Sequence, residues 1–262
     1  DENTLMLNRG GHIYATSGAE RAEALQGMLD KFGVDSRWDA EVTNLLIEDG
    51  AVVGVRYESG STVTDVRASN VIIATGGFGA NVEYRQKVND GVWKEVVLDD
   101  SIGCTNIKPC AQGEGRALAE GAGAELIGLS DIQLHPCGTP GTGLMEDIRT
   151  SGRNRIFVNT EGKRFVNEGA ERDKLCKAIF AQPDGTYWVV VNTLRYPDPD
   201  EPDANGATIN NMLALQHIVT GETVDELAAA MDVDAANLQA SIDAYNAVVD
   251  GATDEFGFVC DN

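Results

Sequence analysis

The sequence predicts a mixed fold that combines the α/β and α+β classes. Short runs of strand-forming residues, separated by turn residues, follow one another between residues 34 and 66, which predicts an antiparallel β-meander. An apolar run at residues 71–74, followed by glycines, is typical of a buried strand in a parallel sheet. Two capped helical patterns within residues 224–249 complete the mixture of elements.

The N-terminal half begins with a helical pattern at residues 18–32, which opens after Ser17 and ends at Gly33 as a C-terminal cap would end it. Gly50 and Gly60 suit hairpin turns, because glycine adopts a positive φ without strain. The strands of the meander are expected at residues 34–38, 42–47, 52–57 and 62–66.

The elements predicted next are a helix, a strand hairpin, a helix, a strand and a surface loop. The first helix is expected at residues 115–121 and the hairpin at 156–158 paired with 165–166. The second helix would start near 173, and the strand and the loop would follow at 187–191 and 196–206. Thr223, with Glu226 three residues later, predicts a capping box for the helix at 224–231. Asp234 is expected to cap the last helix, at 235–249.

Composition excludes several classes of partner. The 262 residues include 42 acidic and 20 basic side chains, for a formal charge of −22. Nucleic acids and anionic lipid surfaces require clustered Lys and Arg, so neither is an expected partner. No apolar run reaches the ~18–20 residues of a membrane span, so no direct membrane insertion is expected. The five cysteines form no Cys-x-x-Cys pair, which predicts unpaired thiols and no metal site.

Two glycine motifs are candidates for contact with a flat or anionic ligand. Residues 75–77, Thr-Gly-Gly, follow the apolar run and would let a ligand or another backbone come close. Residues 113–115, Gly-Glu-Gly, open a helix, and the free amides at a helix N-terminus attract anions. From these residues alone, a tight turn and an ordinary helix start remain the simpler interpretations.

Side chains suited to a carboxylate ligand occur between residues 135 and 172. Glu146 and Arg149 are three residues apart, close enough to pair on a helix. Arg172 precedes a predicted helix, and an arginine, which stays charged, normally binds a carboxylate. His135 lies beside a Gly-rich loop, where binding sites are common. A surface ion pair is the alternative for each arginine.

Five segments, in this order, resemble the flavoprotein subunits of fumarate reductases and succinate dehydrogenases. The similarity is strongest to the soluble flavocytochrome type and to relatives that reduce urocanate, methacrylate or cinnamate. The most specific segment is Ile-Phe-Val-Asn-Thr-Glu-Gly-Lys-Arg-Phe-Val-Asn-Glu, residues 156–168. The other segments are residues 71–81, 113–115, 133–136 and 172–173.

The resemblance implies FAD as the cofactor and a specific domain organisation. Residues 1–130 would form a partial FAD-binding, Rossmann-like domain that includes the β-meander. Residues 131–255 would form an α+β capping domain that closes over the substrate, and residues 256–262 would return toward the FAD domain. Position by position, the cofactor-binding residues would be Val42, Thr75, Gly76, Gly77 and Glu114.

The resemblance also implies which side chains act on the substrate. Arg172 aligns with the arginine that delivers a proton to the substrate, and Glu146 and Arg149 align with the relay that reprotonates it. His135 aligns with a ligand of the substrate carboxylate. Met145 stands where fumarate reductases carry a threonine that contacts substrate, which favours a more apolar enoate than fumarate.

The implied activity is reduction of the carbon–carbon double bond of an α,β-unsaturated carboxylate, with hydride from FAD N5 and a proton from Arg172. An electron-donor protein, a haem or a quinol system would supply the electrons. The family's glycine-rich dinucleotide fingerprint and its second carboxylate-binding His and Arg are absent, and residue 1 is not Met. This chain is therefore expected to be a fragment that is inactive alone and binds FAD weakly or not at all. An exported and a cytoplasmic location both stay open.

Two alternatives remain at this point. One is a flavin dehydrogenase acting on succinate or a ketosteroid, and the other is a binding module that kept the fold but lost catalysis. Glu146, Arg149 and Arg172 together favour carboxylate reduction, because a ketosteroid site would require a tyrosine as the acid.

Overall fold

The computed structural model describes most of the chain as two compact units. One unit comprises Asp1–Asn81 with Pro109–Gly128, and the other comprises Val82–Lys108 with Leu129–Asn262. Side chains are described from residue 22 onward. The described residues are 4–8, 11–14, 18–104, 110–140, 143, 155–196, 198–202 and 206–259. The predicted domain bounds, 1–130 and 131–255, stay a prediction.

The first unit begins with a hairpin and a helix. Strands β1 (Thr4–Asn8) and β2 (Gly11–Tyr14) pair antiparallel, an element that the sequence analysis missed. Helix α1 (Gly18–Lys31) confirms the first predicted helix. It ends at Gly33, whose φ is 68°, and the N–H of Val34 donates to the Leu29 carbonyl at 3.0 Å. This pattern is the predicted glycine cap.

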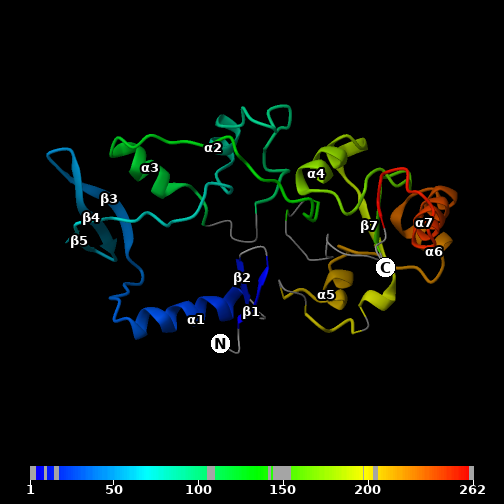
Figure 1. The fold of residues 1–262 in the computed structure, drawn as a ribbon, viewed down its shortest axis with the longest axis horizontal. Coiled ribbons are helices and arrows are strands. Elements are labelled where there is room, and N and C mark those ends of the chain that lie inside the picture. The colour runs from blue at the N-terminus through cyan, green and yellow to red at the C-terminus, as the bar shows by residue number, and fades with distance from the viewer. Residues whose placement is uncertain are drawn as a thin grey trace. The chain divides into compact units, whose positions relative to one another are not determined.

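The β-meander is confirmed (Figure 1). Strands β3 (Glu41–Glu48), β4 (Ala51–Ser59) and β5 (Thr62–Arg67) form an antiparallel sheet in the order β3-β4-β5. The first hairpin turns at Asp49 and Gly50, which have φ values of 50° and 79°. Two successive residues at positive φ suit the right-handed twist of a two-residue hairpin, as the sequence predicted.

Two strands predicted for this unit do not form. Residues 34–38 are irregular, because Arg37 pairs locally with Asp35 at 2.9 Å and the backbone of Asp39 adopts a φ of 51°. Residues 71–74 also form no strand, and Ile72 is 89% exposed. A parallel strand requires a neighbour to pair with, and none of the described strands pairs with this run.

Helix α3 (Glu114–Gly121) confirms the predicted helix and begins one residue earlier than expected. Its N-cap is Gly113, with φ 85°. Arg116 and Glu120 pair at 2.7 Å across one turn, and α3 contacts β3.

The second unit starts with helix α2 (Val82–Lys87), which the sequence analysis also missed. Arg85 on this helix is buried and donates from Nε to the Leu98 carbonyl and from Nη2 to the Ile102 carbonyl, both at 2.7 Å. Trp93 is 1% exposed, and its Nε1 donates to the Ile132 carbonyl at 2.7 Å. The indole thus anchors the segment that leads into Gln133 and His135.

The main core of this unit lies between a small sheet and two helices. Strand β6 (Arg155–Val158) pairs antiparallel with β7 (Trp188–Val191). Helix α7 (Ala235–Val249) packs against β6, and helix α6 (Val224–Met231) packs against α7. The fully buried members of this core are Ile156, Val158, Ala228, Met231, Leu238 and Tyr245.

The predicted pairing of residues 156–158 with 165–166 is wrong, although 188–191 is a strand as expected. Only a single bridge joins Val158 to Arg164 after the predicted turn. The chain leaves the sheet there because the backbone N–H of Arg164 donates to Ser241 of α7 at 3.1 Å. The Arg164 side chain forms ion pairs with Glu168 and Asp254.

Helix caps in this unit follow the sequence closely. Thr223 Oγ1 accepts the Glu226 N–H at 3.2 Å, and Asp234 Oδ1 accepts the Asn237 N–H at 2.8 Å. Both predicted N-caps are confirmed, but the Glu226 carboxylate accepts the N–H of Glu222, at 2.9 Å, instead of the Thr223 N–H of a capping box. Helix α4 (Arg172–Phe180) confirms the helix expected near residue 173. The other helical elements described in this unit are α5 (Ile209–Ala214) and the short 3-10 turns Pro183–Gly185 and Thr193–Arg195.

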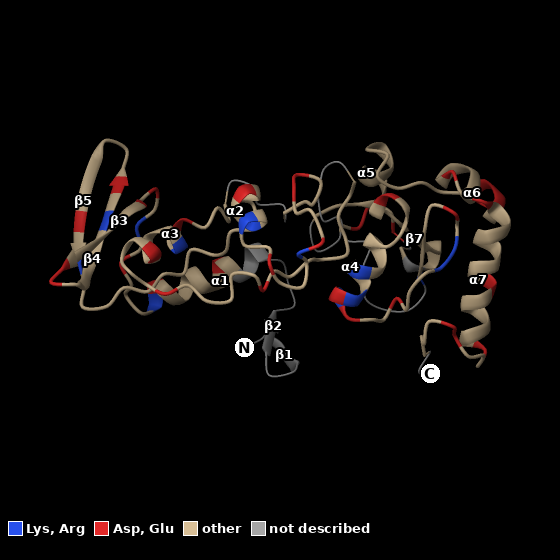
Figure 2. Ribbon diagram, turned by 90° about the horizontal axis from the view of Figure 1, so that it is seen from above, with Lys and Arg blue, Asp and Glu red and all other residues tan. Residues whose placement is uncertain are grey.

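The structure shows where the acidic residues lie and how apolar the helices are. Acidic residues are spread over helices, strands and loops of both units (Figure 2). Across the described ranges, no helix is long and apolar enough to cross a membrane. The described part of the predicted 196–206 loop contains no α-helix or strand.

Cys176, on the buried face of α4, gives a first test of this packing. Burial, with a smaller contribution from Asp173, raises the pKa of its thiol to about 11. The reactive thiolate is therefore scarce at neutral pH. We expect iodoacetamide to modify the exposed Cys110 in the native protein and Cys176 only after denaturation, as read by peptide mass spectrometry. Equal labelling rates in the native protein would contradict the packing of α4.

Candidate functional site

The turn at residues 75–77 is an open stretch of backbone in the first unit. Gly76 adopts a φ of 82°, a conformation that residues other than glycine rarely adopt. A side chain placed at Gly76 or Gly77 would meet nothing within 4 Å, so the backbone at both positions is accessible. An accessible backbone with polar N–H and C=O groups is suited to a flat, hydrogen-bonding ligand.

Helix α3 begins directly against this turn. A Cβ at Gly115 would lie 2.1 Å from Thr75 Oγ1 and 2.6 Å from Ile73 Cγ2. A Cβ at Gly113 would lie 2.9 Å from Phe78 Cβ. The two glycine motifs, far apart in the sequence, are therefore parts of one element, and the glycines permit its close packing.

Hydrogen bonds hold the two motifs together. The Ala80 N–H donates to the Ala111 carbonyl at 3.0 Å, and the Asn81 Nδ2 donates to the Gln112 carbonyl at 3.1 Å. Neither Asn81 nor Ala111 was identified as a site residue from the sequence. Both hydrogen bonds join residues that are 31 positions apart, so the local sequence gives no sign of them.

Glu114 and Val42 lie in the same unit as this turn. Glu114 is exposed in the first turn of α3, where the helix dipole favours an acid. Val42 lies on β3, opposite Tyr57 of β4. The roles predicted for these two residues and for residues 75–77 stay predictions.

Arg172, the predicted proton donor, is the first residue of α4 in the second unit. Its Nη1 donates to Gln133 Oε1 at 3.0 Å, and both side chains are exposed. A cation in the first turn opposes the helix dipole, so local stability does not favour this placement. Among the described residues no carboxylate forms an ion pair with Arg172. The Gln133 amide that contacts Arg172 is neutral, so this contact does not compensate the charge of the guanidinium.

His135 lies two residues after Gln133. Its Nδ1 accepts the Cys137 N–H at 3.2 Å, and the imidazole is exposed. Tyr187 anchors the same segment, because its hydroxyl donates to the Pro136 carbonyl at 2.5 Å. Burial, with the adjacent Cys137, raises the pKa of Tyr187 well above its ordinary value, so the hydroxyl stays protonated and can donate this bond.

The predicted substrate-side residues are only partly described. Arg172, Gln133 and the His135 segment belong to one unit, and Arg172 contacts the same stretch of chain that carries His135. Met145, Glu146 and Arg149 lie outside the described residues, so the substrate contact of Met145 and the relay of Glu146 and Arg149 stay predictions. Arg172 itself is exposed, whereas an arginine can act as an acid only where its guanidinium is desolvated. Gln133 was part of the family-like motif but was not predicted as a partner of Arg172.

Comparison with known proteins places this chain in a family. The sequence profile of the FAD binding domain family matches residues 4–259. The chain belongs to the FAD binding domain family. Its relatives include NADH:acrylate oxidoreductase of Vibrio harveyi, 35% identical over 82% of this chain and 21% of the relative. Urocanate reductase of Eggerthella lenta is 34% identical over 81% of this chain and 35% of that protein.

The structural comparison agrees with the family assignment. The open conformation of a flavocytochrome c3 fumarate reductase matches with a TM-score of 0.64 and 25% identity, over 94% of this chain and 42% of that chain. The predicted mixed FAD-binding fold and the fumarate reductase-like family are thus confirmed. The chain spans about a fifth and about a third of the length of the two relatives named above.

FAD is the cofactor of this FAD binding domain family, and the first unit contains an element that fits it. The open backbone at Gly76 and Gly77 and the glycine-rich start of α3 can face a flat ligand without steric obstruction. Val42, Thr75, Gly76, Gly77 and Glu114 stay the predicted contacts of the cofactor.

Gly115 provides a test of this cofactor element in the full-length protein. We expect Gly115→Ala to lower FAD retention, because the new Cβ would overlap Thr75 Oγ1 and push α3 away from the 75–77 turn. Flavin content per polypeptide after gel filtration measures the effect. Gly121→Ala at the other end of α3, where a Cβ meets nothing within 4 Å, is the matched control. Equal flavin content in both variants would show that α3 does not set the turn.

Proposed function

We propose that the protein containing this chain reduces the carbon–carbon double bond of a small α,β-unsaturated carboxylate. The observation that carries the proposal is Arg172, a guanidinium at a helix N-terminus held by the neutral amide of Gln133. That geometry leaves the positive charge available to an anionic substrate. The relatives support the substrate class, since their names refer to acrylate, urocanate and fumarate.

FAD, when bound and reduced, supplies the hydride to one alkene carbon. Residues of this chain would stabilise the negative charge that develops and supply the proton that the reaction requires. His135 would bind the substrate carboxylate, and Arg172 would stabilise the negative charge that builds beside it. Arg172 would then give a proton to the other alkene carbon, and Glu146 and Arg149 would return one to it.

Proton transfer from an arginine requires that water be excluded from its guanidinium. Arg172 is exposed, so substrate binding must contribute to its desolvation. The Gln133 contact keeps the guanidinium oriented without neutralising it, since an amide oxygen accepts a hydrogen bond but carries no charge. Met145, in place of a threonine, favours a less polar enoate than fumarate.

An anaerobic assay of the full-length protein with a reduced viologen as donor tests the proposal. We expect turnover with at least one monocarboxylate enoate, such as acrylate, methacrylate or a cinnamate, at a higher kcat/KM than with fumarate. The saturated analogues serve as controls and should give no donor oxidation. Donor oxidation with none of the enoates, in a protein that retains FAD, would refute the proposed activity.

A further inference from the structure

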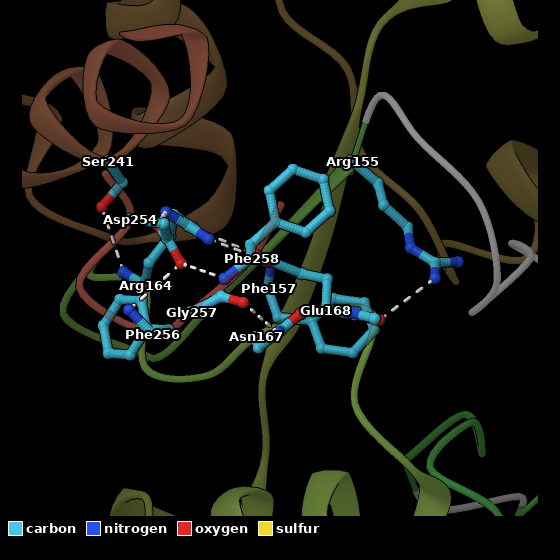
Figure 3. A network of polar contacts seen from close by, with 11 residues as sticks. Arg155, Phe157, Arg164, Asn167, Glu168, Ser241, Asp254, Phe256, Gly257 and Phe258 are labelled. Atoms are coloured by element: carbon cyan, nitrogen blue, oxygen red, sulfur yellow. Dashed lines mark hydrogen bonds and ion pairs between the residues drawn. The ribbon is translucent and has the colours of Figure 1, made fainter. Parts of the chain in front are cut away.

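Three charged side chains form a buried cluster in the second unit (Figure 3). Arg164, Glu168 and Asp254 have side chains that are only 2–3% exposed. Arg164 donates from Nε and Nη2 to the two oxygens of Glu168, at 2.9 and 2.8 Å. Its Nη1 donates to Asp254 Oδ1 at 2.7 Å. With this fork-like pair and the second carboxylate, each of the three guanidinium nitrogens donates to an acid.

The same two carboxylates also bind backbone from other elements. Glu168 Oε1 accepts the Phe157 N–H of β6 at 3.1 Å. Asp254 Oδ2 accepts the N–H groups of Phe256 and Phe258, at 3.1 and 2.9 Å. The cluster therefore joins β6 to the turn at residues 254–258, which follows α7.

Aromatic rings enclose the guanidinium of Arg164. The rings of Tyr245 and Phe256 each have their centroid 5.3 Å from its central carbon. Tyr245 in turn stacks on Phe258 at 5.1 Å. Burial alone would lower the pKa of Arg164, but its hydrogen bonds to the two acids raise it. The Arg164 guanidinium thus stays charged while shielded from solvent, where hydrogen bonds are stronger than at the surface.

The cluster fixes the chain immediately before Arg172. Glu168 lies four residues earlier, so the Arg172 Cα cannot be more than roughly 14 Å from that of Glu168. Just before Glu168, Asn167 Oδ1 accepts the Gly169 N–H at 2.8 Å, and its Nδ2 donates to the Gly257 carbonyl at 3.0 Å. The loop that ends at Arg172 is therefore held from both β6 and the 254–258 turn.

We propose that Glu168, through its contacts with Arg164 and Asp254, is a positioning residue that sets the location of Arg172 for proton delivery. This inference rests on the proposed function. Because its three side chains are only 2–3% exposed, the cluster offers no open face for a ligand. It acts by restricting the loop between β6 and α4, so loosening it displaces the proton donor, and small displacements of a reacting group lower the rate steeply.

A double-mutant cycle in the full-length protein tests the positioning role. Glu168→Gln keeps the shape of the side chain but removes the charge that binds Arg164. We expect it to lower kcat by about 10–100-fold with little change in KM, because the lost geometry matters in the transition state. In the Arg172→Ala background, Glu168→Gln should have no further effect on the residual rate. Met231→Ala, in the same core but outside the cluster, is the control for lowered stability.

The outcomes separate this inference from the proposed function. A wild-type rate for Arg172→Ala would refute both the proton donor and the positioning role. A slow Arg172→Ala protein in which Glu168→Gln still costs the same factor would refute the positioning role alone. So would a Met231→Ala protein with the same fall in Tm and the same fall in kcat. If Glu168→Gln does not fold, Asn167→Ala replaces it in the cycle with the same expected and refuting results.

Discussion

Arg172→Ala is expected to lower the kcat of enoate reduction by the full-length protein by about 10²–10⁴-fold, the range that a positioned proton donor contributes. Alanine removes both the proton and the positive charge, and the Gln133 amide cannot replace either. Because the charge acts mainly on the transition state, kcat should fall far more than KM rises. Steady-state kinetics with a reduced viologen measure both.

Lys174→Ala is the matched control for this variant. Lys174 lies on the same helix, and its exposed side chain reaches Glu171 only at 4.0 Å. Removing it takes away one positive charge near Arg172 without touching the Gln133 contact. Similar kcat losses in the two variants would mean that general electrostatics, rather than a specific proton donor, accounts for the effect.

Glu168→Ala should destabilise the protein by about 3–5 kcal/mol, because it leaves a buried guanidinium with one carboxylate instead of two. The substitution also leaves the buried Phe157 N–H without its acceptor. Thermal or urea unfolding of the full-length protein measures the change. Glu161→Ala, which removes an exposed ion pair with Lys163 a few residues away, should leave the midpoint almost unchanged.

The cluster also predicts how stability depends on pH. Burial favours the neutral form of Asp254, but hydrogen bonds from Arg164 and from the Phe258 and Phe256 N–H groups lower its pKa below the ordinary 3.8. The stabilisation from this shift is therefore present above pH 3.8 and is lost as the pH falls through the lowered pKa. In Asp254→Asn, this acid-induced part of the destabilisation should be absent. An unchanged acid profile would contradict the assignment.

The sequence predicted well those elements that short-range interactions determine. The Thr223 and Asp234 caps, the Gly33 helix end and the hairpin turn at Gly50 depend on residues only a few positions apart. Their physical causes, a side-chain acceptor for a free N–H or a positive φ, are visible in the sequence itself.

The predictions that failed depended on distant partners. Residues 71–74 have the composition of a parallel strand, yet composition does not say whether a neighbouring strand is present. Residues 165–166 were predicted to pair with the nearest strand, whereas that strand, β6, pairs with β7. Arg164 instead donates a hydrogen bond to Asp254, ninety positions away. The Gln133 partner of Arg172 was missed for the same reason.

Rapid mixing of the fully reduced, full-length protein with an enoate in the absence of oxygen tests the central claim most directly. The account predicts that the flavin absorbance returns to the oxidised spectrum in a single turnover and that the saturated acid appears in equal amount. In Arg172→Ala, the same return should be slowed by the factor seen in kcat. A wild-type flavin that stays reduced in the presence of every enoate would contradict the account.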